Sequence, residues 1–186
     1  MKYKVIQPPT QVITLAELRE HLRVEEVAPA QDAMIIAYLD ASRDYAQHYT
    51  GTAIGNQTIE IALDCFPENG ILLAPGPVTS ITSIKYIDSA GVEQTVANTL
   101  YTLDDYGMQH WALPKSGTSW PTPLDVANSV KVRYVAGTLA PAVRSALLLH
   151  VGFVFANREA VNIGNITSEL PLGVRALLDT VKVWGV

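Results

Sequence analysis

Apolar residues recur at helical spacing through the first fifty positions of the chain. Residues 14–17 read Thr-Leu-Ala-Glu, a capping-box pattern in which Thr14 caps a short helix and the glutamate reaches back to the start of that helix. This helix is expected to end near Arg23. Apolar and small residues at steps of three and four then predict a second helix over about 31–49, and Gly51 suits the left-handed position that often ends a helix.

The pattern changes to a period of two between residues 56 and 137. Apolar and polar residues alternate, β-branched residues are frequent, and prolines and glycines interrupt the runs, which is typical of short strands joined by turns. Such a succession indicates a small antiparallel β-sandwich or a barrel-like region. Strands are predicted at 58–64, 79–87, 92–96, 100–103, 111–113 and 129–135.

A third helix is predicted from Pro141, which suits the first helical turn, to about Asn157. Its apolar residues cover nearly the whole circumference, which is typical of a helix that is buried on every side. A chain with few helices cannot provide that cover alone. We therefore expect one face to pack within the domain and another to pack against a neighbouring subunit, with Leu148, Phe153 and Phe155 as candidate interface residues.

The carboxyl-terminal part of the sequence contains a polar stretch over 158–170 and a short predicted helix over about 172–181. Residues 182–186 follow as a separate tail. Trp184 lies two residues from the end of the sequence and has little intramolecular core to join. We expect this side chain to act as an anchor in a pocket of a partner protein.

These patterns together predict an α+β protein. Residues 1–55 and 138–186 would form a helical core of about four helices, and residues 56–137 would form an inserted antiparallel β-sandwich or barrel-like region. A length of 186 residues fits one domain, or one domain with an insertion. A chain of this size buries enough surface to fold without a disulfide or a structural metal.

Composition narrows the function. Charged residues make up 17% of the chain, against about 25% in a typical soluble protein, so we expect partners to cover part of the surface. The net charge is −5 and the bases are scattered, which argues against sequence-specific DNA binding. The sequence shows neither an apolar signal core nor an apolar run of about 20 residues, so we expect a soluble protein with no membrane partner, made and used in the cytoplasm.

Residues with chemical potential are sparse. Four histidines and one cysteine, Cys65, show no metal-ligand spacing, so no metal or cofactor is expected, and Cys65 is read as a small buried hydrophobe. The strongest enzyme candidate is Asp104 and Asp105 with His110, a group able to perform acid–base work or bind a metal. The same residues suit an aspartate-rich turn, the interpretation that we favour. The chain is therefore not expected to be an enzyme.

Three bases on separate predicted strands, Lys85, Lys131 and Arg133, are the remaining candidates for a functional surface. They could line a surface near nucleic acid. Ordinary solvated strand faces explain them equally well.

Several short phrases occur in an order that is similar to one known family. They are Tyr49–Ile54, Phe66-Pro67 with Ile71–Leu73, Pro77–Asp88, Trp120-Pro121, Tyr134–Gly137 and Asn157–Glu159. Each phrase is weak alone, but their joint order resembles that of the head–tail connector (adaptor) proteins of long-tailed double-stranded DNA phages. The likeness extends from about Leu15 to the end of the sequence, and the β insertion is its least transferable part.

The resemblance implies a helical core that carries a β domain and assembles as a homo-oligomeric ring, twelvefold to match the portal. Such a ring would sit at the head–tail interface of a virion made in a bacterial host, extend the channel for non-specific passage of double-stranded DNA, and offer a platform to stopper or tail proteins. It implies no catalysis and no cofactor. In such adaptors the carboxyl-terminal segment reaches into the portal protein. In this sequence that segment is Lys182, Val183, Trp184, Gly185 and Val186.

Two other interpretations stay open. The chain could be a β-sandwich module of a virion that binds a carbohydrate or a protein, which an exposed row of Tyr101, Tyr106, Trp111 and Trp120 would favour. It could also be a hydrolase that uses the loop with Asp104, Asp105 and His110, which a convergent pocket would favour.

Overall fold

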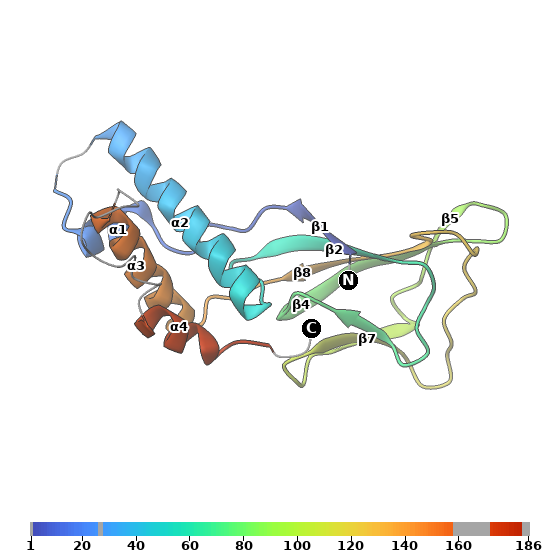
Figure 1. Cartoon of the computed structure of the whole chain (residues 1–186). Coiled ribbons are helices and arrows are strands. Elements are labelled where there is room, and N and C mark those ends of the chain that lie inside the picture. The colour runs from blue at the N-terminus through green and yellow to red at the C-terminus, as the bar shows by residue number, and fades with distance from the viewer. Residues whose placement is uncertain (1, 26–27, 158–171, 184–186) are drawn as a thin grey trace. The chain divides into compact units, whose positions relative to one another are not determined.

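The protein is described by a computed structural model that covers residues 2–25, 28–157 and 172–183 (Figure 1). Within these residues the chain forms four helices and eight strands, so the predicted α+β class is confirmed. The chain divides into two compact units. The β unit comprises the described residues of 1–10 and 55–138, and the helical unit comprises those of 11–54 and 139–185.

The helical unit contains all four helices, α1 (Leu15–Leu22), α2 (Pro29–Thr50), α3 (Pro141–Ala156) and α4 (Leu172–Asp179). The Thr14 hydroxyl accepts a hydrogen bond from the Glu17 backbone N–H at 3.3 Å, as the capping pattern predicts. The Glu17 carboxylate instead pairs with Arg144 Nη2 at 2.5 Å, which ties α1 to α3. Gly51 takes the left-handed conformation, with φ of 70°, and ends α2.

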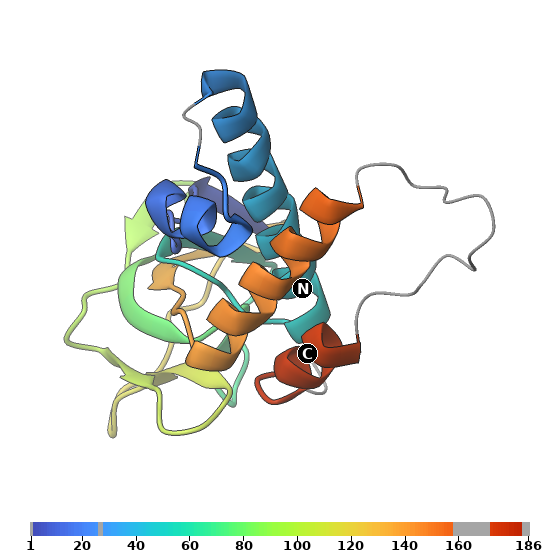
Figure 2. The same cartoon turned by 90° about the vertical axis from the view of Figure 1, so that its left-hand side faces the viewer.

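Helix α3 is the central element of this unit. It contacts each of the other three helices, and Figure 2 shows it (orange) alongside α2 (blue). Contacts on several sides account for most of its apolar circumference. The fully buried core around it is formed by Ile13, Leu18, Ile35, Leu39, Ala46, Ile54, Val143, Ala146, Leu147, Val151, Val174 and Leu178.

The β unit consists of two antiparallel sheets. The larger has the order β1-β2-β8-β4-β5 and the smaller the order β3-β7-β6. Antiparallel pairing throughout confirms the predicted β-rich region. The strands are β1 (Lys2–Gln7), β2 (Gln57–Leu63), β3 (Ile71–Leu73), β4 (Val78–Ile87), β5 (Glu93–Thr95), β6 (Tyr101–Asp104), β7 (His110–Pro114) and β8 (Val130–Ala136).

Strand β1 departs from the sequence-based expectation, which placed residues 1–55 with the helices. It pairs antiparallel with β2, with Tyr3 opposite Ile61 and Val5 opposite Ile59, and so belongs to the β unit. The pairing joins segments more than fifty residues apart, and a six-residue strand gains stability only from such a partner. The local pattern at the start of the chain therefore carried little signal for it.

One glycine is required where the chain leaves β8. Gly137 has φ of +120°, and a Cβ at this position would clash with the backbone carbonyl oxygen of Gly55. The two backbones approach closely here, and Gly55 N–H donates to the Thr138 carbonyl at 3.2 Å. Only glycine allows both this conformation and this approach.

Candidate docking surfaces

The beginning of the expected docking tail is held against the end of α2. Lys182 Nζ lies 4.3 Å from the centroid of the Tyr49 ring, within cation–π range. The Val183 backbone N–H donates to the Thr50 carbonyl at 2.9 Å, and Val183 is partly buried. Trp184, Gly185 and Val186 lie outside the described residues. Of the five expected docking residues, the two that the structure describes are therefore engaged within the helical unit.

An aromatic and polar network supports this position. The Tyr49 hydroxyl donates to Asp179 Oδ1 at 2.7 Å, and this bond to a carboxylate is the main reason why the pKa of Tyr49 is raised. Tyr45 stacks on Tyr49 with ring centroids 5.9 Å apart. His150 meets the Tyr45 ring edge-on at 5.5 Å, and burial lowers its pKa. Residues from α2, α3 and α4 thus converge at the start of the tail.

The three residues expected at a subunit interface on α3 are all partly buried. Leu148 and Phe155 pack against the core of their own helical unit, and Phe153 is half-buried. The large apolar side chain that α3 leaves most exposed is Leu149, with 46% of its surface accessible. The solvent-exposed apolar face of α3 is therefore narrower than the sequence indicates. It includes Leu149, which is not among the interface residues expected from the sequence.

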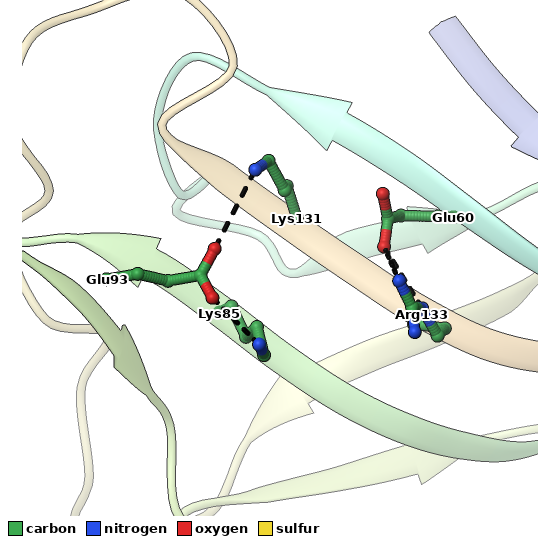
Figure 3. A network of polar contacts seen from close by, with 5 residues as sticks. All are labelled: Glu60, Lys85, Glu93, Lys131 and Arg133. Carbon is green, nitrogen blue, oxygen red and sulfur yellow. Dashed lines mark hydrogen bonds and ion pairs between the residues drawn. The ribbon is translucent and has the colours of Figure 1, made fainter.

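A charged face covers one side of the five-stranded sheet and brings together the three bases singled out in the sequence. Lys85 Nζ lies 2.7 Å from Glu93 Oε1, and Lys131 Nζ lies 3.7 Å from Glu93 Oε2. Arg133 donates from Nε and Nη2 to Glu60 Oε2, at 3.0 and 2.7 Å. Figure 3 shows Glu93 between its two lysines and Glu60 beside Arg133.

The opposite side of this sheet is apolar. Fully buried residues alternate with partly buried ones along β2 and β8, as a period of two requires, and β4 adds a fully buried residue opposite Val132. They include Ile59, Ile61, Ile84, Val132 and Tyr134. The charged face is therefore an ordered surface fixed by the register of the sheet.

The proposed hydrolase loop forms a turn and a structural histidine. Asp104 Oδ1 accepts a hydrogen bond from the Tyr106 backbone N–H at 3.2 Å, which is an aspartate turn. His110 is 8% exposed, and its Nδ1 lies 2.9 Å from the Val78 backbone N. Asp105 is exposed. The imidazole is thus engaged by backbone, and the geometry favours the turn interpretation.

The aromatic residues of the β unit do not form one exposed row. Trp120 stacks on Phe66, with ring centroids 5.0 Å apart and an angle of 10°, and Tyr101 approaches the same indole at 6.4 Å. Phe66 and Trp120 belong to two of the phrases that carry the family resemblance, and their role is packing. Tyr106, by contrast, is fully exposed.

Two further expectations concern metals and thiols. Cys65 is exposed, so its interpretation as a buried hydrophobe is wrong, because it follows β2 where the chain leaves the sheet. In the part of the chain that the structure describes, no three His, Cys, Asp or Glu side chains are grouped to hold a metal ion. No helix there has the length and apolar character needed to cross a membrane.

The described residues form an α+β fold of two units, and comparison with known proteins relates this fold to one family. Residues 12–98 match the family model described as phage gp6-like head-tail connector protein. This match confirms the connector family that the sequence resembles. No curated protein sequence matches the chain.

Solved structures show the same fold along the full length. A chain in the virion of a native gene transfer agent particle, and one in the neck of an empty particle, each share 23% sequence identity with this chain at a TM-score of 0.80. A chain in the neck of a native particle, computed with C12 symmetry, shares 21% identity at a TM-score of 0.74. Each match covers 100% of this chain and 97% of the other. The fold is therefore that of these neck proteins.

Proposed function

We propose that this protein is the structural head–tail connector of a tailed virion or virion-like particle. Copies form a ring beneath the portal, extend the DNA channel and give stopper or tail proteins a platform. The observation that carries the proposal is the family match over residues 12–98. The likeness of the whole chain to neck proteins supports it, and the symmetry of one of those necks supports a twelvefold ring.

The role is mechanical rather than enzymatic. The family is one of structural connectors, and the loop of Asp104, Asp105 and His110 is organised by backbone hydrogen bonds. A net charge of −5 suits a channel through which DNA must pass. Each contact between a basic side chain and a phosphate would have to be broken as the DNA moves, and this would slow translocation.

Residues 182–186 are proposed as the segment that docks on the portal, with a division of labour. Lys182 and Val183 fix the origin of the segment at the end of α2, through the Tyr49 ring and the Thr50 carbonyl. Residues 184–186, with Trp184 as the anchor, make the contact with the portal. A fixed origin lowers the conformational entropy lost on docking.

The test is binding of the purified chain to its purified portal rings. Deleting 184–186 leaves Lys182 and Val183 in place, so the melting temperature should not change while co-sedimentation with portal rings is lost. Deleting 182–186 should also remove docking and should lower the melting temperature slightly. Unchanged co-sedimentation of both truncated chains would refute the docking role. Failure of the full chain to bind portal rings, seen by negative-stain imaging, would refute the connector role.

A further inference from the structure

The β6–β7 hairpin carries the most exposed aromatic side chain among the large hydrophobic residues of the described chain. Tyr106 at its tip is 100% exposed and Met108 is 65% exposed. The turn is held by the hydrogen bond from the Tyr106 N–H to Asp104 Oδ1, and Asp105 is exposed beside it. An ordered turn that presents tyrosine and methionine to water has the composition of a protein-contact anchor. Its two carboxylates add negative charge around that anchor.

The charged face has the complementary sign. Glu93 lies between Lys85 and Lys131, and Glu60 lies between Arg133 and the position of Lys4, its partner in the β1–β2 register. Four bases therefore surround two carboxylates, which leaves an excess of two positive charges on a chain whose net charge is −5. Lys131 is the loosely paired member, at 3.7 Å from Glu93. A carboxylate from another molecule would give this ammonium group a second ion pair.

Ring assembly needs such a pair of surfaces. Identical subunits close into a ring through a head-to-tail interface, in which one surface of a copy meets a different surface of the next. Copies with a net charge of −5 repel one another unless regions of opposite sign meet. The hairpin tip belongs to the three-stranded sheet and the charged face to the five-stranded sheet, so they are different surfaces with opposite charges.

A second copy fits this face better than DNA does. Each base that the structure pairs there already faces a carboxylate, so a phosphate backbone would meet negative charge as well as positive. The hairpin tip brings only two carboxylates, Asp104 and Asp105, whereas a duplex brings a continuous row of phosphates. The Tyr106 ring of the tip can also lie over a basic side chain. DNA offers no contact for the exposed Met108.

We propose that the β6–β7 hairpin tip of one copy, Asp104–Met108, docks on the charged face of the next copy around Lys85, Lys131 and Arg133. The contact rests on the proposed ring and supplies one of its head-to-tail interfaces. The free apolar face of α3 around Leu149 is a separate surface in the helical unit.

Thiol cross-linking tests this contact. In a Cys65→Ser chain, Asp105→Cys and Lys131→Cys introduce one thiol on each surface. A bifunctional thiol reagent about as long as an extended lysine–aspartate pair should give a ladder of covalent oligomers that ends at the closed ring. The matched control combines Asp105→Cys with Glu20→Cys on an exposed position of α1. It should give only the collision background, and an equal ladder in both chains would overturn the proposal.

Charge exchange provides an independent readout. Asp105→Lys or Lys131→Glu should each weaken oligomer formation by more than about tenfold, because like charges then meet. The chain with both changes should recover it. Absence of recovery in a chain with normal far-ultraviolet circular dichroism would contradict the contact. If the reversed face impairs folding, Tyr106→Ser on the exposed tip still has to reduce the cross-linked ladder.

The outcomes separate this contact from the connector role. A chain that binds portal rings but gives no ladder above the control loses this contact alone. A chain that gives the ladder but ignores portal rings keeps the contact and loses the connector role. Protection of Lys131 from lysine modification by short duplex DNA, with no ladder, would assign the face to DNA instead.

Discussion

Two leucines on α3 allow folding and assembly to be perturbed separately. Leu147 is 1% exposed and lies in the core of the helical unit, whereas Leu149, two residues on, is 46% exposed. Leu147→Ala removes a fully buried side chain and leaves a cavity, which costs about 2–5 kcal/mol of unfolding free energy. Leu149 contributes only about half of the roughly 1.5–3 kcal/mol that full burial of a leucine provides.

We propose that a neighbouring subunit covers the exposed half of Leu149 on assembly. Such cover would contribute roughly 1 kcal/mol per copy. Leu149→Ala should therefore lower the unfolding free energy by about 1 kcal/mol and weaken assembly on portal rings by a similar amount. Leu149→Asp should fold but fail to assemble, since a carboxylate at an apolar contact must be desolvated without a partner.

The assay pairs urea denaturation of the isolated chain with sedimentation on portal rings. Leu147→Ala is the control for folding, and its loss should appear in the urea midpoint with an unchanged slope. Assembly of Leu149→Asp at the level of the parent chain would refute the idea that this face of α3 contacts another subunit. An unfolding cost below about 1 kcal/mol for Leu147→Ala would refute the packing of the core.

Three further predictions address other parts of the chain. Gly137→Ala should cause a large drop in melting temperature, because the added Cβ clashes with the backbone of the β unit. Gly91→Ala should cost far less stability, because the added Cβ meets nothing within 4 Å. Equal effects would contradict the close approach of the two backbones at Gly137. Burial lowers the pKa of His150 below 6.5, so protons bind more readily to the unfolded chain and stability should fall as the pH drops below that value. His150→Gln should reduce the dependence of the urea midpoint on pH between about pH 7 and pH 5. An unchanged dependence would exclude this histidine as its source. Val183→Pro removes the N–H that bonds to Thr50, and hydrogen exchange of α4 amides should accelerate while α1 amides stay unchanged; no acceleration would mean that the start of the tail is not held there.

Local patterns predicted the elements that local interactions stabilise. The Thr14 cap, the ends of α2 at Gly51 and of α3 near Asn157, and the main strands all appear within a few residues of their expected places. Caps, left-handed glycines and alternating burial are properties of short segments, so they are visible in the sequence. The order of short phrases then indicated the family correctly.

The docking surfaces depended on long-range pairing and were visible only in part. The sequence indicated that α3 is covered on all sides, but contacts with three other helices, not chiefly another subunit, supply most of that cover. The sequence indicates that Lys85, Lys131 and Arg133 could line a surface, but only the register of β4 with β8 shows that they share one face. The sequence places Lys182 and Val183 in the expected docking segment, but it does not show that Tyr49 and Thr50, more than 130 positions earlier, contact them.

The most direct test of the account is an electron-microscopy reconstruction of the protein assembled on its own portal. We expect the reconstruction to show a closed ring of copies beneath the portal. The start of the tail should lie beside α2, residues 184–186 should lie in portal pockets, and a neighbouring copy should cover the Leu149 side chain. Portal rings without added density, or copies that stand apart with the carboxyl-terminal residues in solvent, would contradict it.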